Sequence, residues 1–169
     1  MTDAAYERAV REHRNRVFTH AVWVLRDREE AADAAQEAMV RLWQHRSRVE
    51  ETAVRGWLLT TVHRLALDRL RRRAVRGDGS EPEEIDALPG QAIDPERAAA
   101  SALACRSLEA ALAGLSPRDR AIVVLREIEG FAYEEIAAMY DLPMGTLKAA
   151  LHRTREKLRV SLLAQGVRP

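Results

Sequence analysis

Residues 131–159 hold a proline-marked turn between two short helical patterns, and this feature constrains the fold more than any other in the sequence. Apolar residues at three- and four-residue intervals predict a first helix over Tyr133–Met139. Pro143 disfavours helical geometry at Leu142 and is suited to the start of a new helix. A second helix is therefore expected from about Met144, which gives a helix-turn-helix.

The predicted second helix has two chemically different faces when its residues are spaced at about 100°. The apolar face comprises Leu147, Ala150, Leu151, Thr154, Leu158 and Leu162. The opposite, cationic face comprises Lys148, His152, Arg155 and Arg159, flanked by Ala149 and Arg153. In helix-turn-helix proteins the second helix enters the DNA major groove, where Lys and Arg read guanine and neutralise phosphates. The alternative is a solvated face on an ordinary amphipathic helix, and the preceding helix and turn weigh against it.

The composition favours an all-α chain. Ala, Leu, Arg and Glu dominate, while runs of strand-forming Val, Ile and Thr are nearly absent. The single cysteine, Cys105, excludes a disulfide framework within one copy and fits a reducing compartment. The charged first residues lack the apolar segment of an export signal, and no run approaches about 18 apolar residues. We therefore expect a cytoplasmic protein without membrane insertion.

Charge divides the chain into three blocks. Residues 1–77 carry 16 Lys and Arg against 11 Asp and Glu, residues 78–100 carry 1 against 7, and residues 101–169 carry 10 against 8. The acidic block also holds clustered glycines and prolines with little periodicity, which predicts a flexible linker over 77–97. This linker could lie against the basic helices when DNA is absent, or it could serve solubility alone.

Three helical patterns precede the linker and predict a first domain over residues 1–76. Helical spacing of apolar residues indicates helices over 4–25, about 30–45 and 54–75. The first two are expected to pair as an antiparallel hairpin across the polar turn Arg26–Glu29. The third ends in a basic run formed by Arg69, Arg71, Arg72, Arg73 and Arg76. Such a run suits phosphate binding, but cations at a helix end also suit the helix dipole.

A second domain of four helices is predicted over residues 98–169. An alanine-rich helix is expected over 96–114. The segment Ser116–Asp119 then supplies an N-cap residue, a proline and an acid, so that a new helix begins there and stops at Gly130. The helix-turn-helix follows, although Ala132 stands where an N-cap side chain is usual, and the loss of a cap typically costs about 1 kcal/mol.

No catalytic motif is present in the sequence. There is no Gly-rich phosphate loop, HExxH, paired-cysteine or GxSxG pattern. The histidines lie far apart, and none has a metal-ligand spacing to Cys105. We therefore expect a protein that is not an enzyme and that has no catalytic site, no metal site and no cofactor.

Three segments carry a resemblance to a known family. They are DREEAADAAQEAMVRLWQ (Asp27–Gln44), RGWLLTTVHRLALDRLRRR (Arg55–Arg73) and LSPRDRAIVVLREIEGFAYEEIAAMYDLPMGTLKAALHRTREKL (Leu115–Leu158). In this order, and with this linker, they resemble the extracytoplasmic-function sigma factors of the sigma-70 family. The resemblance covers nearly the whole chain. It implies a sigma region 2-like domain that reads the −10 promoter element and a sigma region 4-like domain that reads the −35 element.

The resemblance also implies roles for individual residues. It places −35 recognition at Tyr133, Thr146, Lys148, His152, Arg153 and Arg155. It places −10 recognition and melting at Trp57, Thr60, Arg64, Arg69, Arg71, Arg72 and Arg73. An exposed base would be held in a pocket beside the Arg46–Val54 loop. For Trp57 a place in the core is the more common alternative.

The implied partners are core RNA polymerase, promoter DNA and an anti-sigma factor. The polymerase would be contacted at its clamp coiled coil and its flap. Clamp binding is implied for one helix, through Asp33, Gln36, Glu37, Arg41 and Trp43. The alternative for that helix is a member of the hairpin with a solvated acidic edge. The expected function is promoter-specific initiation of transcription, with control by the anti-sigma factor.

Two positions depart from the family's usual pattern. Arg64 stands where members usually have Asn, at the position that resembles the lining of the base pocket. Because Arg only donates whereas Asn also accepts, we expect an altered −10 base preference. Ala149 and Ala150 stand where Ser and Arg are usual. We therefore expect −35 reading to be weaker or differently specific than usual, and to depend on Lys148, His152, Arg153 and Arg155.

Two other functions remain open at this stage. A stand-alone helix-turn-helix regulator would dimerise through its N-terminal helices and bind a palindrome with half-sites about 10 bp apart. A sigma mimic would sequester an anti-sigma factor without using DNA. A mimic has no need for the basic run at Arg69–Arg76, which favours a protein that binds DNA.

Overall fold

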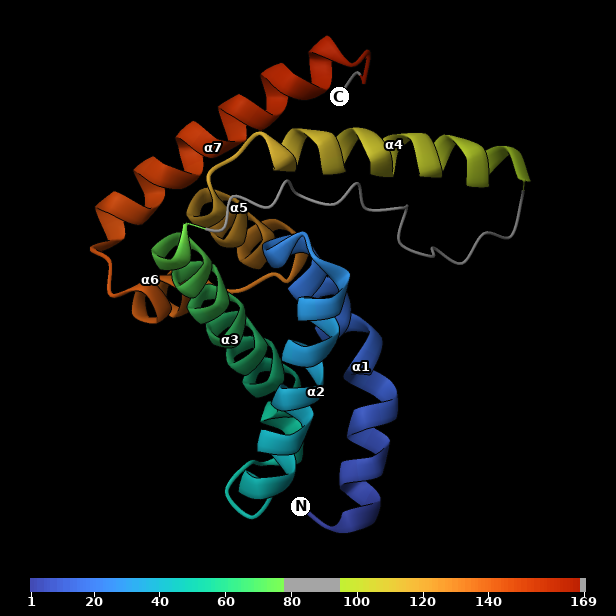
Figure 1. Cartoon of the computed structure of the whole chain (residues 1–169), viewed down its shortest axis with the longest axis vertical. Coiled ribbons are helices and arrows are strands. Elements are labelled where there is room, and N and C mark those ends of the chain that lie inside the picture. Colours follow the sequence, from blue (N-terminus) through green and yellow to red (C-terminus); the bar gives the residue numbers. More distant parts are fainter. Residues whose placement is uncertain (78–94, 168–169) are drawn as a thin grey trace. The chain divides into compact units, whose positions relative to one another are not determined.

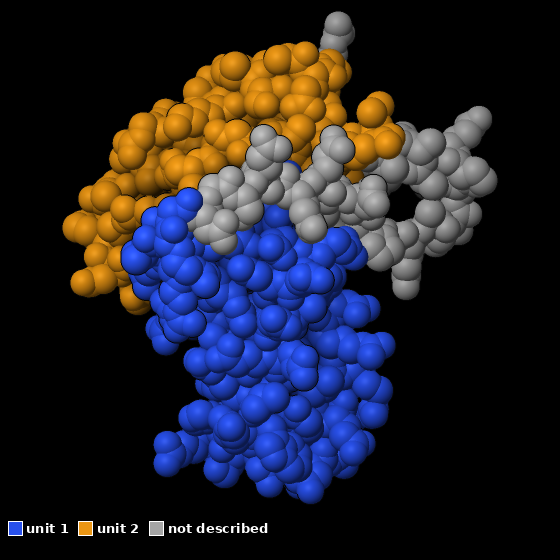
Figure 2. All heavy atoms as spheres, in the orientation of Figure 1, with its two compact units in different colours: residues 1–83 blue, residues 84–169 orange. Residues whose placement is uncertain are grey.

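The computed structural model describes residues 1–77 and 95–167, with side chains from residue 103 onward in the second range. The chain forms two compact units, 1–83 and 84–169, which Figure 2 colours separately. Every regular element in the described residues is a helix (Figure 1). The predicted all-α class is therefore confirmed.

Unit 1 is a bundle of α1 (Asp3–Leu25), α2 (Arg28–His45) and α3 (Val54–Arg76). Each of the three helices contacts the other two (Figure 1). The predicted hairpin of the first two helices is present. One short 3-10 turn, η1 (Glu51–Ala53), which the sequence did not predict, leads into α3.

The turn between α1 and α2 is built from two adjacent residues. Arg26 adopts a left-handed conformation with φ 52°, and its N–H donates to Val22 O, which ends α1. The side chain of Asp27 accepts a hydrogen bond from the N–H of Glu30 at 2.8 Å. Asp27 therefore caps α2, which begins at Arg28 rather than at the predicted Glu30.

The core of unit 1 contains two histidines among its apolar side chains. His20 from α1 and His63 from α3 are fully buried, with Nε2 of His20 3.0 Å from Nδ1 of His63. Burial, and then the neighbouring His20 and Arg64, lower the pKa of His63 well below its ordinary value. His63 is therefore neutral at pH 7, and the contact between the two ring nitrogens joins α1 to α3.

Unit 2 contains α4 (Pro95–Ala113), α5 (Pro117–Val123), α6 (Tyr133–Tyr140) and α7 (Met144–Ala164). The long helix α7 contacts each of the other three. As predicted, Ser116 caps α5, and its hydroxyl accepts from the N–H of Asp119 at 3.1 Å.

A π-helical turn, η2 (Val124–Ile128), continues α5 where an ordinary helix was predicted. The N–H of Glu129 donates to Val124 O at 3.0 Å, which is the five-residue bond of a π-helix. One extra residue in a turn rotates the following side chains by about 100° relative to a continuous α-helix. The prediction was wrong on this point, because side-chain periodicity carries no signal for a single wide turn.

The helix-turn-helix is formed by α6 and α7. Asp141 has φ 50°, and the N–H of Leu142 returns to Ala137 O at 2.9 Å, so the chain turns sharply before Pro143. Pro143 occupies the N-cap position of α7 rather than its first turn. The predicted packing face is confirmed by the burial of Leu147, Leu151 and Thr154.

Candidate nucleic-acid interface

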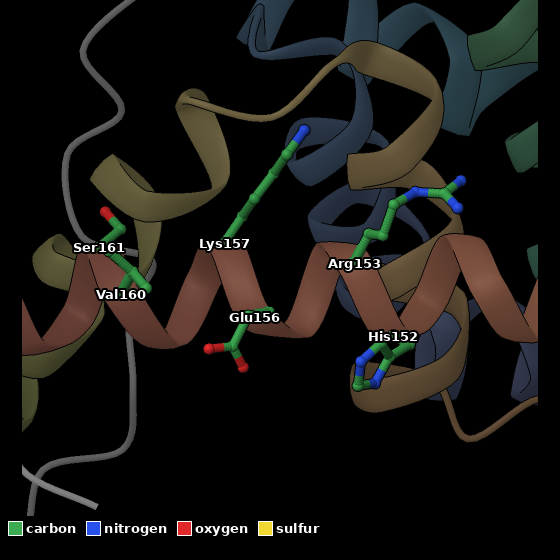
Figure 3. A pocket seen from close by; sticks show the side chains of 6 residues that line it. All are labelled: His152, Arg153, Glu156, Lys157, Val160 and Ser161. Carbon is green, nitrogen blue, oxygen red and sulfur yellow. The ribbon is translucent and has the colours of Figure 1, made fainter.

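The outer face of α7 carries most of the residues predicted to bind the −35 element. Thr146, Lys148, His152, Arg153 and Arg155 are all exposed on this helix. Figure 3 shows Arg153 and Lys157 extending from one side of α7, and His152 and Glu156 from the other. The same stretch lines a shallow surface hollow of about 530 Å³ that includes Val160 and Ser161. Ala149 is exposed, so a small side chain lies among these polar groups.

Arg155 is held by groups of its own unit. Its Nε and Nη2 donate to one oxygen, Oε1, of Glu127 at 3.0 and 2.6 Å, and Nη2 also donates to the Tyr133 hydroxyl at 3.2 Å. Arg126 lies over the Tyr133 ring, with Cζ 4.5 Å from its centroid. The hydrogen bond from Arg155 lowers the pKa of Tyr133, while the bond to Glu127 raises the pKa of Arg155. The structure thus joins α7, η2 and α6 through one guanidinium.

The basic run at the end of α3 is divided between tied and exposed arginines. Arg73 bonds the carboxylates of Asp27 at 2.7 Å and Glu30 at 2.9 Å, and its side chain is only 16% exposed. Arg69 lies 3.5 Å from Glu37 and is 21% exposed. Arg71 is exposed and pairs with Asp68 of its own helix at 3.0 Å, whereas Arg72 and Arg76 are exposed without an ion pair in the described residues.

The other predicted −10 residues lie along α3 on its way to the basic run. Arg64 is exposed, while Thr60 and Trp57 are half-buried. The Trp57 ring lies 6.0 Å from the ring of His45, at the end of α2. Trp57 thus belongs to the edge of the bundle, with part of its ring open to solvent.

The outer face of α2 carries the residues predicted to bind polymerase. Asp33, Gln36 and Arg41 are exposed, whereas Glu37 is half-buried and accepts from Arg41 Nη2 at 2.6 Å. Trp43 is 38% exposed. Beside this face a groove of about 320 Å³ is lined by Arg14, Asn15, Phe18, Ala32, Ala35, Gln36 and Met39.

The exposed Trp43 is fixed by its neighbours. The ring of Tyr6 meets it edge-on at 4.9 Å, and the guanidinium of Arg46 lies 3.8 Å from its centroid. The Tyr6 hydroxyl donates to Met39 O at 3.2 Å, and burial raises its pKa. These contacts hold a large apolar side chain in one orientation at the surface, as an interface anchor requires.

Sequence reasoning missed the acids that hold these cations. Asp27 and Glu30 lie more than 40 residues from Arg73, and Glu127 lies 28 residues from Arg155. Local periodicity contains no signal for such pairs. Asp27 does carry a local signal, as an N-cap residue before α2, but the prediction from the sequence placed it in the turn and did not use that signal.

Within the described residues, no group of three or more His, Cys, Asp or Glu side chains is placed to hold a metal ion. Among those residues no helix is both long and apolar enough to span a membrane.

The chain has a helix-turn-helix whose second helix is exposed and cationic, and it also has a helical bundle with a basic helix end. These features define the class of helical DNA-binding proteins. Two family models match the chain in this order: sigma-70 region 2 over residues 9–76 and sigma-70 region 4 over residues 105–158. The chain belongs to the sigma-70 family, in its extracytoplasmic-function (ECF) group.

Curated relatives and a solved structure agree with this placement. The chain is 34% identical to the ECF RNA polymerase sigma factor SigE of Mycolicibacterium smegmatis over 92% of its own length, but it spans only 60% of that relative. It is 29% identical to SigL of Mycobacterium tuberculosis, with 98% of this chain and 93% of the relative covered. The fold is similar to that of the sigma factor RpoE in its complex with the anti-sigma factor NepR from Bartonella quintana. That likeness has a TM-score of 0.71 at 22% identity, over 93% of this chain and 96% of the other.

Proposed function

We propose that this chain binds core RNA polymerase and directs promoter-specific initiation of transcription. The observation that carries the proposal is the match of sigma regions 2 and 4, in that order, to two units that each expose a cationic helix surface. The chain itself is not an enzyme. The polymerase catalyses RNA synthesis, and the chain determines which promoter is recognised.

The domain assignment is part of the proposal. Residues 1–76 act as the region 2-like domain, and residues 98–169 act as the region 4-like domain. The acidic linker between them, 77–97, lies outside the described residues except at its ends. The two family matches support this division, because each falls within one of the assigned domains.

Recognition of the −35 element is assigned to the outer face of α7. Lys148, His152 and Arg153 are exposed there and can donate to base edges and phosphates. Thr146 and Arg155 lie on the same face, while Tyr133 of α6 contributes through its contact with Arg155. Ala149 offers no polar atom, so specificity is expected to differ from that of members with Ser at this position.

Recognition of the −10 element is assigned to α3. Arg71 and Arg72 are exposed and suited to the phosphates of an opened strand, whereas Trp57 and Thr60 offer partly exposed surfaces for an unstacked base. Arg64 is exposed and can only donate hydrogen bonds. Promoter selection with wild type and Arg64→Asn tests its role, and identical −10 preferences would contradict it.

Polymerase binding is assigned to α2, with the clamp coiled coil as its partner. The exposed polar residues Asp33, Gln36 and Arg41 lie on the same helix as the anchored Trp43. This combination of an aromatic anchor with a polar rim is typical of protein interfaces. The flap of the polymerase is assigned to unit 2 on the family resemblance alone.

An anti-sigma factor is proposed as the regulator, and the cytoplasm as the place of action. The support is indirect: the similar RpoE structure is a complex with the anti-sigma factor NepR. A protein that binds core polymerase acts where the polymerase is, so the cytoplasmic assignment depends on the proposed function.

The direct test is transcription of genomic DNA fragments by purified core polymerase, with and without this chain, followed by mapping of transcript starts. New starts that share −35 and −10 sequences are expected. A chain that binds duplex DNA alone, but neither binds core polymerase nor directs initiation, would instead be a stand-alone regulator. A chain that binds an anti-sigma factor without using DNA would be a sigma mimic.

A further inference from the structure

Arg155 lies in the middle of the cationic face of α7, yet its hydrogen-bonding capacity is largely used inside unit 2. A guanidinium has five N–H groups, one on Nε and two on each terminal nitrogen. The Nε hydrogen and one Nη2 hydrogen go to Glu127, and the second Nη2 hydrogen goes to Tyr133. Only the two hydrogens of Nη1 remain.

This distribution prevents the usual reading of guanine by arginine. The planar bidentate contact of arginine with guanine O6 and N7 uses two parallel N–H groups on neighbouring nitrogens of the guanidinium. The two such pairs in Arg155 are Nε with Nη2 and Nη1 with Nη2, so both include Nη2. Both Nη2 hydrogens are already engaged in hydrogen bonds. In this geometry Nη1 can still donate to a phosphate oxygen, which needs no fork.

Tyr133 complements the remaining donor. Because its hydroxyl oxygen accepts from Arg155, its hydrogen is available for an acceptor outside the unit. The Arg126 guanidinium over the ring adds positive charge at the same place. Nη1 of Arg155 and the hydroxyl of Tyr133 thus form a pair of donors whose chemistry suits one backbone phosphate.

We infer that Glu127 is a specificity-determining residue: its carboxylate withdraws Arg155 from base reading and restricts it to the DNA backbone. The reading of −35 bases then rests on Lys148, His152 and Arg153. Glu127 itself touches no DNA and acts through Arg155. This inference rests on the proposed function, because it concerns how the same helix reads a promoter.

The ion pair between Glu127 and Arg155 is strong enough to favour one orientation of the guanidinium, and weak enough to be removed by mutation. Both side chains are about half exposed, at 46% for Arg155 and 47% for Glu127. An ion pair in such a position is screened by solvent and salt, so the cost of breaking it is modest. Removal of the carboxylate should therefore release Arg155 without unfolding unit 2.

The test is selection from a promoter library randomised over the −35 element, with a fixed −10 element, by holoenzyme made from core polymerase and the full chain. Glu127→Ala is expected to gain a preference for guanine of about tenfold at one −35 position, the discrimination of a good bidentate contact. Glu127→Gln, which keeps the shape of the side chain, should show a smaller change in the same direction.

Two further variants separate this effect from others. The double variant Glu127→Ala/Arg155→Ala must lose the new guanine preference, because Arg155 is the reader that the single change releases. Glu134→Ala removes an exposed carboxylate from α6, where no hydrogen bond or ion pair links it to the described residues. It should strengthen binding to all sequences and leave the base preference unchanged.

The outcomes distinguish failure of the inference from failure of the function. If wild-type holoenzyme selects no motif, the proposed function is wrong. If wild type selects a motif and Glu127→Ala selects the same one, the inference is overturned while the function stands. A new preference that persists in the double variant would also overturn it.

Discussion

The two cationic surfaces of this protein differ in how many of their charges are already neutralised. At the end of α3 in unit 1, Arg73 and Arg69 are bound to acids of α2 and are mostly covered. On α7 in unit 2, Lys148 and Arg153 are exposed, and neither forms an ion pair with any described residue. Part of the basic run of α3 thus holds the bundle of unit 1 together, whereas Lys148 and Arg153 of α7 have no counter-ion among the described residues.

The difference shows that charge counts do not reveal which cations are available to DNA. Arg72 and Arg73 are neighbours in sequence, but one is exposed and the other is clamped to the turn between α1 and α2. Removal of one partner from a covered pair costs stability, because the remaining charge is left partly buried without its counter-ion. Substitutions at the two positions should therefore affect different properties.

The largest effect is expected for Arg73→Ala. It leaves the carboxylates of Asp27 and Glu30, which are about 30% exposed, without their counter-ion and removes the link between α3 and α2. A loss of roughly 2 kcal/mol in the free energy of unfolding follows from the partial burial of these charges. Urea unfolding followed by tryptophan fluorescence measures it, because Trp23, Trp43 and Trp57 all lie in unit 1.

Arg72→Ala is the matched control for Arg73→Ala. Its side chain is exposed, so stability should change by less than about 0.5 kcal/mol, while binding to −10 DNA in holoenzyme weakens. Equal losses of stability in the two variants would contradict the proposal that Arg73 stabilises the bundle and Arg72 does not.

A second prediction compares two arginines within unit 2. Arg153→Ala should cost about 1–3 kcal/mol of discrimination at one −35 position, because an exposed Arg can read a guanine with its full fork. Arg155→Ala should weaken binding evenly across sequences, because only Nη1 reaches the backbone. Affinities of holoenzyme for promoters with single −35 changes measure both, and a base-specific loss in Arg155→Ala would contradict the comparison.

Much of the fold was readable from the sequence, because helices depend on local spacing and on caps. The periodic spacing of apolar residues predicted α1, α3 and α7, and the N-cap residue Ser116 predicted the start of α5. The candidate site was readable only in part. The exposed residues of α7 could be assigned from one helix, but the ties of Arg73 and Arg155 depend on acids brought near by tertiary packing.

A third prediction concerns pH and unit 1. His63 is neutral in the fold because its pKa is lowered, whereas the unfolded chain takes up a proton below about pH 6.5. Below that pH the unfolded state binds one more proton than the folded state. The free energy of unfolding therefore decreases as the pH is lowered, by up to about 1.4 kcal/mol per pH unit. His63→Leu should flatten this slope in urea unfolding read by tryptophan fluorescence.

The exposed His152 of unit 2 supplies the control for that pH effect. His152→Gln should leave the slope measured by tryptophan fluorescence unchanged, since the three tryptophans report on unit 1. If the slope is the same in wild type and His63→Leu, the buried pair is not its source.

The smallest effect concerns how two of the helices begin, α2 in unit 1 and α6 in unit 2. In unit 1 a side chain caps α2, whereas α6 begins at Ala132 without a side-chain acceptor. Glu135 compensates in part, because its Oε2 accepts from the N–H of Ala132 at 2.7 Å. Ala132→Ser would complete this reciprocal capping box by accepting from the N–H of Glu135.

The expected gain from Ala132→Ser is about 0.5–1 kcal/mol, and it should appear as slower hydrogen exchange of the α6 amides in the full chain. Ala138→Ser, at an exposed position inside α6, is the matched control and should lower protection slightly because Ser favours a helix interior less than Ala. Equal protection in both variants would mean that Glu135 alone already fixes the start of α6. In that case, the missing cap would not distinguish α6 from α2, and the contrast between the two units would rest on the arginines alone.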